Sequence, residues 1–120
     1  MSILMEFISR CVLAPLFEEC YFRFLPSLII LRANAKDSKL LWISSFIWLI
    51  LHYDTLHEIM VNEGLLWGLA NTCILVLDMI LYTLLWLNVV KTRRLRYGLM
   101  AIGLHGLRNF LALINNFFFS

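Results

Sequence analysis

Several residues of this sequence could do chemistry, and they lie inside stretches that are otherwise apolar. A charged side chain at the centre of a membrane is costly, so each such residue needs a partner or a function. Most of them fall into short patterns of characteristic spacing, and one acid, Asp78, is isolated. They are Glu18, Glu19 and Arg23, then His52, then Asp78, then His105, Arg108 and Asn109.

Two adjacent glutamates, Glu18 and Glu19, precede Arg23 in the first apolar stretch. On a helix, Glu19 and Arg23 are spaced i, i+4 with the acid first, which is the favourable order for an ion pair. Glu18 lies about 100° further around the helix, so Arg23 does not hold it in the same manner. We predict that Glu19 is structural and that Glu18 is free to act as a base. The alternative is that both carboxylates only satisfy Arg23 and a polar group of another helix.

His105 and Asn109 are also spaced i, i+4 and share one helix face. Gly103 and Gly106 beside them allow close approach of another helix. An imidazole and an amide on one face can orient water and donate hydrogen bonds to a developing oxyanion. The alternative is a hydrogen-bonding pair between helices. His52 ends an apolar run, where a lone histidine is more often interfacial than catalytic.

Taken together, these groups supply a base, an orienting imidazole and oxyanion donors, which is the set needed to hydrolyse an amide. No HExxH motif occurs, so the ordinary zinc-peptidase helix is absent. A zinc site is an alternative, because Glu18, His52 and His105 are residue types that bind zinc. Asp78 could pair with Arg108 across the bundle, meet a backbone donor or be protonated. A path through Asp78 and the histidines would instead indicate a small proton- or ion-handling subunit.

The elements that carry these residues are long apolar segments. The chain is 62% hydrophobic and 15% charged, whereas soluble domains carry about 25% charged residues. Each segment is near the ~20 residues of a membrane helix and too long for a membrane strand. We predict an all-α, polytopic membrane helix bundle of about four transmembrane helices in one domain, residues 1–120. The segments cover approximately residues 12–31, 40–56, 64–90 and 98–119.

The links between the segments differ in charge. Basic residues gather in 32–39 and 91–96, whereas the link around 57–63 and its flanks carry acids and no base. The positive-inside rule then predicts cytoplasmic first and third links and both termini outside. The basic stretches are too narrow for a nucleic-acid surface, so we expect no nucleic-acid partner. The three cysteines lie in apolar stretches and predict no disulfide.

The depth of the candidate residues constrains the first helix. With four equal, straight spans, Glu18 and His52 would lie nearer the outer side and His105 nearer the inner side. A first helix that begins near Ile3 places Glu18 close to the middle of the membrane. We therefore predict a long, tilted first helix with a kink at Pro15.

Three motifs occur in order on successive segments: EExxxR at 18–23, aromatic-xxx-His at 48–52 and HxxxN at 105–109. In this order the chain resembles the CAAX-protease and bacteriocin-processing (Abi) family of intramembrane peptidases. Ala14-Pro15, before the glutamates, is also similar to the family. The chain departs from it at Phe24, where members often have glycine, and at Trp48, where phenylalanine is usual.

The resemblance implies an all-α membrane endopeptidase that hydrolyses a peptide bond of a protein or peptide substrate. It implies water activated by glutamate, with a divalent metal such as zinc as the alternative. The implied residue roles are Glu18 as the base, His52 as a holder of the water, His105 and Asn109 as the oxyanion pair, and Glu19 with Arg23 as structural support.

Family members usually have further membrane helices before the first motif, so the chain is expected to be a minimal or truncated core. A non-catalytic membrane protein of the same fold, such as a bacteriocin self-immunity factor or an assembly subunit, is the alternative function. The expected partners are membrane lipid and a protein or peptide substrate. A membrane protein partner or a second copy of the chain is a further alternative.

Overall fold

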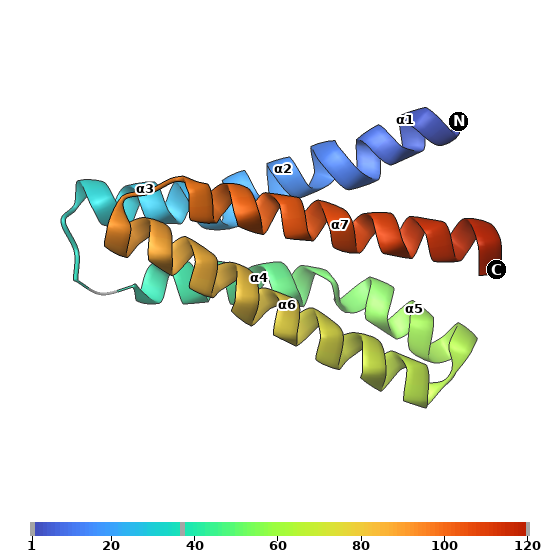
Figure 1. Ribbon diagram of the computed structural model, residues 1–120. Coiled ribbons are helices and arrows are strands. Elements are labelled where there is room, and N and C mark those ends of the chain that lie inside the picture. Colours follow the sequence, from blue (N-terminus) through green and yellow to red (C-terminus); the bar gives the residue numbers. More distant parts are fainter. Residues whose placement is uncertain (1, 37, 120) are drawn as a thin grey trace.

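The computed structural model describes residues 2–36 and 38–119, with side chains described as far as residue 115. The described residues form helices joined by short links, without a strand, as predicted for an all-α fold (Figure 1). In chain order the elements are α1 (Ile3–Phe7), η1 (Ile8–Leu13), α2 (Ala14–Glu19), η2 (Cys20–Phe24), α3 (Leu25–Arg32), α4 (Lys39–Leu51), α5 (Tyr53–Glu63), α6 (Leu65–Thr92) and α7 (Arg96–Phe119).

The elements α1 to α3 follow one another without a break and form one helix, residues 3–32, called the first helix below. The Ser2 side chain caps its start by accepting a hydrogen bond from the Met5 backbone N–H at 3.2 Å. The predicted start near Ile3 is therefore confirmed. Its N-terminal part runs obliquely to α7 (Figure 1).

Two segments of the first helix, η1 and η2, are π-helical rather than α-helical. The residue after η1, Ala14, donates its N–H to the Ser9 carbonyl, which is an i→i−5 bond. Pro15 comes next and has no N–H to donate. The same pattern recurs one residue before Pro26, where the residue after η2 also bonds five positions back. The irregularity expected at Pro15 is therefore a widened turn before the proline, and a second one, not predicted, precedes Pro26.

The second apolar segment ends earlier than predicted, and the polar link after it is helical. His52 separates α4 from α5 with φ −89° and ψ 3°, outside the helical region. The expected link at 57–63 is the second half of α5, so that prediction was wrong. Its polar sequence hid the helix, which packs along α6. Gly64, with φ 102°, then turns the chain into α6.

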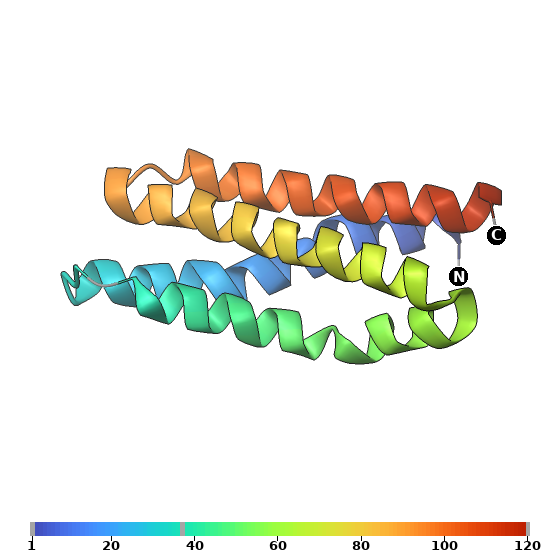
Figure 2. The same ribbon diagram turned by 90° about the horizontal axis from the view of Figure 1, so that it is seen from below.

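The bundle consists of four rods, which are the first helix, the pair α4 and α5, the helix α6, and the helix α7. They run side by side and alternate in direction (Figures 1 and 2). Both termini and the α5–α6 link lie at one end. The links that follow α3 and α6 lie at the other end. The two basic links therefore share one end of the molecule, and the acidic helix α5 reaches the opposite one.

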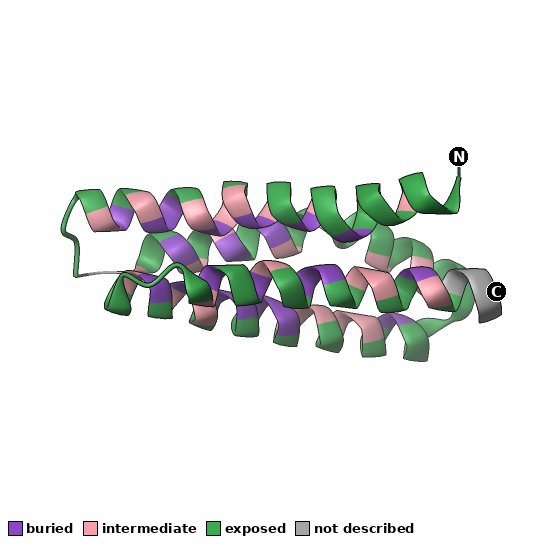
Figure 3. Ribbon diagram, turned by 45° about the horizontal axis from the view of Figure 1, so that its top comes forward, coloured by how far each residue is buried: buried purple, intermediate pink, exposed green. Residues whose placement is uncertain are grey.

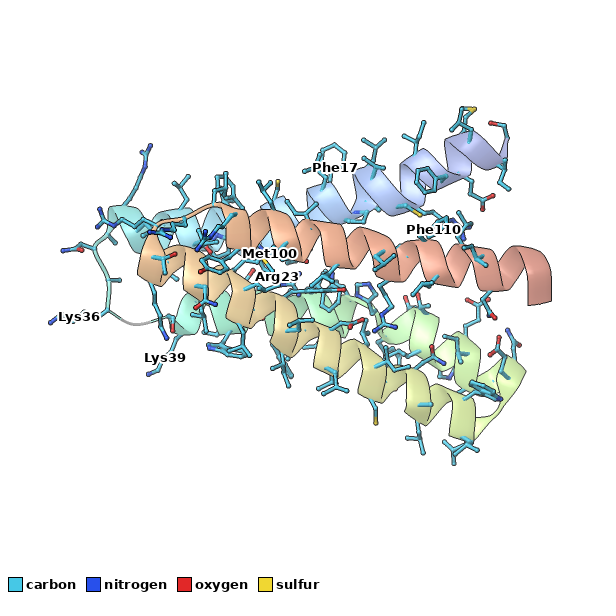
Figure 4. The ribbon with its side chains drawn as sticks, in the orientation of Figure 1. Phe17, Arg23, Lys36, Lys39, Met100 and Phe110 are labelled. Atoms are coloured by element: carbon cyan, nitrogen blue, oxygen red, sulfur yellow. The ribbon has the colours of Figure 1, made fainter. Side chains whose placement is uncertain are left out.

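Burial is restricted to the inward faces of the rods, and the outward faces are exposed (Figure 3). Trp48 and Trp86 are among the largest fully buried side chains, whereas Leu66 is 80% exposed and Phe17 is 68% exposed. Phe17 points away from the bundle (Figure 4). Such an extensive exposed apolar surface is unusual for a soluble monomer. A lipid environment solvates it without cost.

Two of the helices, α6 and the stretch Arg96–Asn115 of α7, are long and apolar enough to cross a membrane. Over the residues that the structure describes, the other two rods contain no uninterrupted α-helix of the ~20 residues that a membrane span needs. The first helix is divided by the π segments, and α4 has 13 residues. The four-span architecture therefore stays a prediction.

Candidate active site

Three of the four rods bring the candidate residues together in the middle of the bundle. Glu18 and Glu19 come from α2, Arg23 from η2, Trp48 from α4 and His105 from α7. The interior position of Arg23 is visible between the rods (Figure 4). Contacts among these residues span up to 86 positions of the sequence, so the site forms only when the whole bundle forms.

Glu19 is the centre of a buried hydrogen-bond network. Its Oε1 accepts from Arg23 Nη1 at 2.7 Å and lies 3.0 Å from His105 Nδ1. Its Oε2 accepts from Trp86 Nε1 at 2.8 Å. The side chains of Glu19 and Arg23 are both fully buried. The predicted i, i+4 ion pair is confirmed, and Glu19 has no carboxylate oxygen left for a substrate.

Glu18 is held on one side only. Its Oε2 accepts a hydrogen bond from Trp48 Nε1 at 2.7 Å and lies 3.3 Å from His105 Nε2. Its side chain is 30% exposed. Among the described residues, none makes a hydrogen bond to Oε1 of Glu18. A fixed carboxylate with one free, accessible oxygen can accept a proton from water.

Arg23 lies between two aromatic rings that sequence reasoning did not connect with it. Its guanidinium carbon is 4.6 Å from the ring centroid of Trp48 and 5.4 Å from that of Tyr82. Its Nε and Nη2 are buried and have no hydrogen-bond partner in the described part of the chain. The electron-rich ring faces stabilise the cation there. Tyr82 also stacks on His105, with centroids 5.2 Å apart.

His52 lies beside the glutamate cluster without bonding to it. Its Nδ1 is 2.8 Å from the Trp48 carbonyl, one turn earlier on the same helix, and its ring lies 4.5 Å from that of Trp48. His52 lines a cavity of about 260 Å³ between α5, α6 and α7, which Asn71 and Asn109 also line. It therefore lies at the wall of this cavity, while its ring contacts Trp48, the residue that holds Glu18.

Asn109 lies on the same helix as His105 but, among these described residues, makes no hydrogen bond to Glu18 or Glu19. Its Nδ2 donates to the backbone carbonyl of Arg10 in η1 at 2.8 Å. The structure thus brings Glu18, Glu19 and His105 into direct contact, and it places Asn109 at the cavity wall with a backbone partner.

Asp78 forms an ion pair with Arg108 across the bundle, one of the three arrangements considered for it. Arg108 Nε donates to Oδ2 at 3.0 Å, and Nη2 donates to Oδ1 at 3.2 Å. The Asp78 side chain is 9% exposed and that of Arg108 is 48% exposed. Both residues line the same cavity as His52.

The geometry does not fit a metal held by Glu18, His52 and His105. In each histidine only Nε2 is left for a metal, because Nδ1 lies against Glu19 in His105 and against the Trp48 carbonyl in His52. In the described part of the chain, no three histidine, cysteine, aspartate or glutamate side chains are grouped to hold a metal ion.

Comparison with known families agrees with the motif set. The type II CAAX prenyl endopeptidase Rce1-like family matches residues 1–111, nearly the whole chain. The chain therefore belongs to this Rce1-like family, which is a family of membrane-embedded proteases. The resemblance to CAAX proteases is confirmed. Comparisons with curated proteins and with solved structures found no match.

Proposed function

We propose that this chain is a multi-pass membrane endopeptidase that hydrolyses a peptide bond of a protein or peptide substrate with water activated by Glu18. The observation that carries the proposal is the divided environment of that carboxylate. Oε2 is fixed by Trp48 and lies against His105, while Oε1 is free of protein partners among the described residues. Membership of a protease family supports the same function.

The proposed reaction begins with a water molecule at Glu18 Oε1. Glu18 takes one proton from this water, and the water oxygen bonds to the carbonyl carbon of the substrate. When the C–N bond of the resulting tetrahedral intermediate breaks, the proton held by Glu18 passes to the leaving amine. Glu18 returns to its ionised state, so protons and charge balance over the cycle.

His105 is the proposed donor to the oxyanion that forms during attack. Glu19 holds its Nδ1 and Tyr82 stacks on its ring, so its orientation is fixed before substrate arrives. Its Nε2 lies toward Glu18. When Glu18 accepts the proton of water and becomes neutral, its attraction for Nε2–H weakens. The same N–H can then stabilise the negative charge on the substrate oxygen.

The cavity lined by His52, Asn71 and Asn109 is the proposed approach for water and for the substrate backbone. With Nδ1 of His52 against the Trp48 carbonyl, Nε2 is the ring nitrogen left to hold water. This is the role that the family resemblance implies for His52. The arrangement of α6, α7 and the two remaining rods as four membrane spans belongs to the same proposal.

The test is cleavage of a peptide ending in a prenylated CAAX motif by the chain reconstituted in lipid vesicles. Glu18→Gln keeps the shape of the side chain but removes the base, and we expect a 10²- to 10⁴-fold loss of cleavage. His105→Ala should cause a comparable loss. Glu6→Gln is the matched control, because Glu6 is a partly exposed glutamate of the same helix that pairs with Arg10 rather than with the residues of the site.

Two outcomes would contradict the proposal. Cleavage by Glu18→Gln at the rate of the Glu6→Gln control would remove Glu18 from the reaction. A folded wild-type chain that cleaves neither this peptide nor an unprenylated one would instead favour the non-catalytic membrane protein of the same fold.

A further inference from the structure

The backbone carbonyl of Arg10 has lost its helical donors because of the sequence around Pro15. In an α-helix its donor would be the N–H of Ala14, but that group donates to the Ser9 carbonyl. In a π-helix its donor would be residue 15, and proline has no N–H. A backbone carbonyl without a donor is costly where water is excluded.

Asn109 supplies the missing donor from another helix. Its Nδ2 lies 2.8 Å from the Arg10 carbonyl oxygen. One turn earlier on α7, Gly106 allows the backbones to approach, because a Cβ there would lie 2.5 Å from the Cys11 carbonyl oxygen. The face of α7 that carries Gly106 and Asn109 is therefore packed directly on the backbone of η1.

We infer that Asn109 is a positioning residue that clamps α7 to η1 at the Arg10 carbonyl. The glutamates lie on α2, which follows η1 without a break, and His105 lies one turn before Asn109 on α7. The clamp thus joins the helix that carries the glutamates to the helix that carries His105. The clamp stands on its own geometry, and only its effect on cleavage rests on the proposed function.

The clamp and a role as oxyanion donor differ in their dependence on Pro15. If Asn109 acts by satisfying the Arg10 carbonyl, the substitution Pro15→Ala makes it dispensable, because alanine restores the backbone N–H that a π-helix directs to that carbonyl. If Asn109 instead donates to the substrate, Asn109→Ala causes the same loss of cleavage whichever residue stands at position 15. A double-mutant cycle separates the two.

The experiment measures Tm in detergent micelles and cleavage in vesicles for the wild type, Asn109→Ala, Pro15→Ala and the double variant. We expect Asn109→Ala alone to lower Tm by about 2–6 °C and cleavage by about 10- to 100-fold. In the Pro15→Ala background the same change should shift Tm by less than about 1 °C and leave cleavage within about twofold of that background. Equal losses of Tm and cleavage in both backgrounds would overturn the clamp.

Pro26 provides the matched control, since it also follows a π segment and leaves a carbonyl, that of Tyr21, without its helical donors. Tyr21 is 70% exposed and its carbonyl faces no clamp among the described residues. In the Pro26→Ala background, Asn109→Ala should keep its full effect. Rescue by Pro26→Ala as well would show a general relaxation of the helix and would also overturn the clamp.

A second variant keeps the test open if Pro15→Ala does not fold. Asn109→Asp, measured as a function of pH up to about pH 10, keeps the side-chain shape, and once its carboxyl is ionised it replaces the donor with an acceptor that faces the Arg10 carbonyl. We expect a Tm loss at least as large as that of Asn109→Ala. A wild-type Tm in Asn109→Asp would refute the clamp even if the wild-type chain shows no cleavage.

Discussion

Glu18 and Glu19 are neighbours in the sequence but have different environments. Glu19 is fully buried, and Arg23, Trp86 and His105 occupy its two oxygens. Glu18 keeps a free oxygen and partial exposure. One position along the helix therefore separates a residue that holds the bundle together from one that can meet a substrate.

At the residue scale, we expect Glu19→Gln to lower the free energy of unfolding by about 3 kcal/mol, because it leaves the Arg23 charge buried without a counter-charge. The matched control is Glu6→Gln, which breaks a partly exposed i, i+4 pair with Arg10. That pair should be worth less than about 1 kcal/mol. Unfolding in mixed detergent micelles measures both, and equal losses would mean that Glu19 is not the centre of the network.

The Glu19–Arg23 pair could be predicted because both residues lie on one helix, where spacing fixes their distance. The contacts of Arg23 with Trp48 and Tyr82 could not be predicted, since they depend on how α4 and α6 are rotated about their axes. The free oxygen of Glu18 was expected from its angular offset. The hydrogen bond that fixes the other oxygen comes from Trp48, whose sequence signal was its place in the aromatic-xxx-His motif.

At the scale of elements, the early start of the first helix could be predicted from depth, because Glu18 has to reach the level of His105. The helix α5 could not, since its sequence is polar and its helical state depends on packing against α6. The π segments carry no apolar pattern of their own. Pro15 and Pro26 indicate an irregularity there but not its form.

The contact between α7 and η1 predicts opposite effects for two glycines on neighbouring turns. Gly106→Ala places a Cβ 2.5 Å from the Cys11 carbonyl oxygen, so the helices must separate. We expect a loss of about 1–3 kcal/mol in the free energy of unfolding. Gly103→Ala meets no atom within 4 Å and should be neutral or stabilising by up to about 1 kcal/mol. Unfolding in detergent micelles checks both, and equal effects would contradict the close approach.

At the scale of the whole molecule, the basic links lie together at one end and α5 reaches the other. This arrangement is what alternating membrane spans require, and the positive-inside rule predicts that the basic end is cytoplasmic. The charges of the links therefore predict how the bundle, and with it the site, is oriented in the membrane.

The topology can be tested with single cysteines in a cysteine-free chain in oriented membrane vesicles. We expect Lys36→Cys and Arg94→Cys to react with an impermeant thiol reagent from the cytoplasmic side. Glu58→Cys should react only from the opposite side. Labelling of all three from one side would contradict the four-span arrangement.

The two buried tryptophans also give the site an optical signal. Trp48 Nε1 donates to Glu18, and Trp86 Nε1 donates to Glu19, so each indole reports on one of the two glutamates. The chain has four tryptophans, and the other two, Trp42 and Trp67, can be replaced by phenylalanine. Indole emission depends on the charge next to its ring, so neutralisation of Glu18 changes the emission of Trp48. Fluorescence can therefore follow events at the proposed base without a labelled substrate.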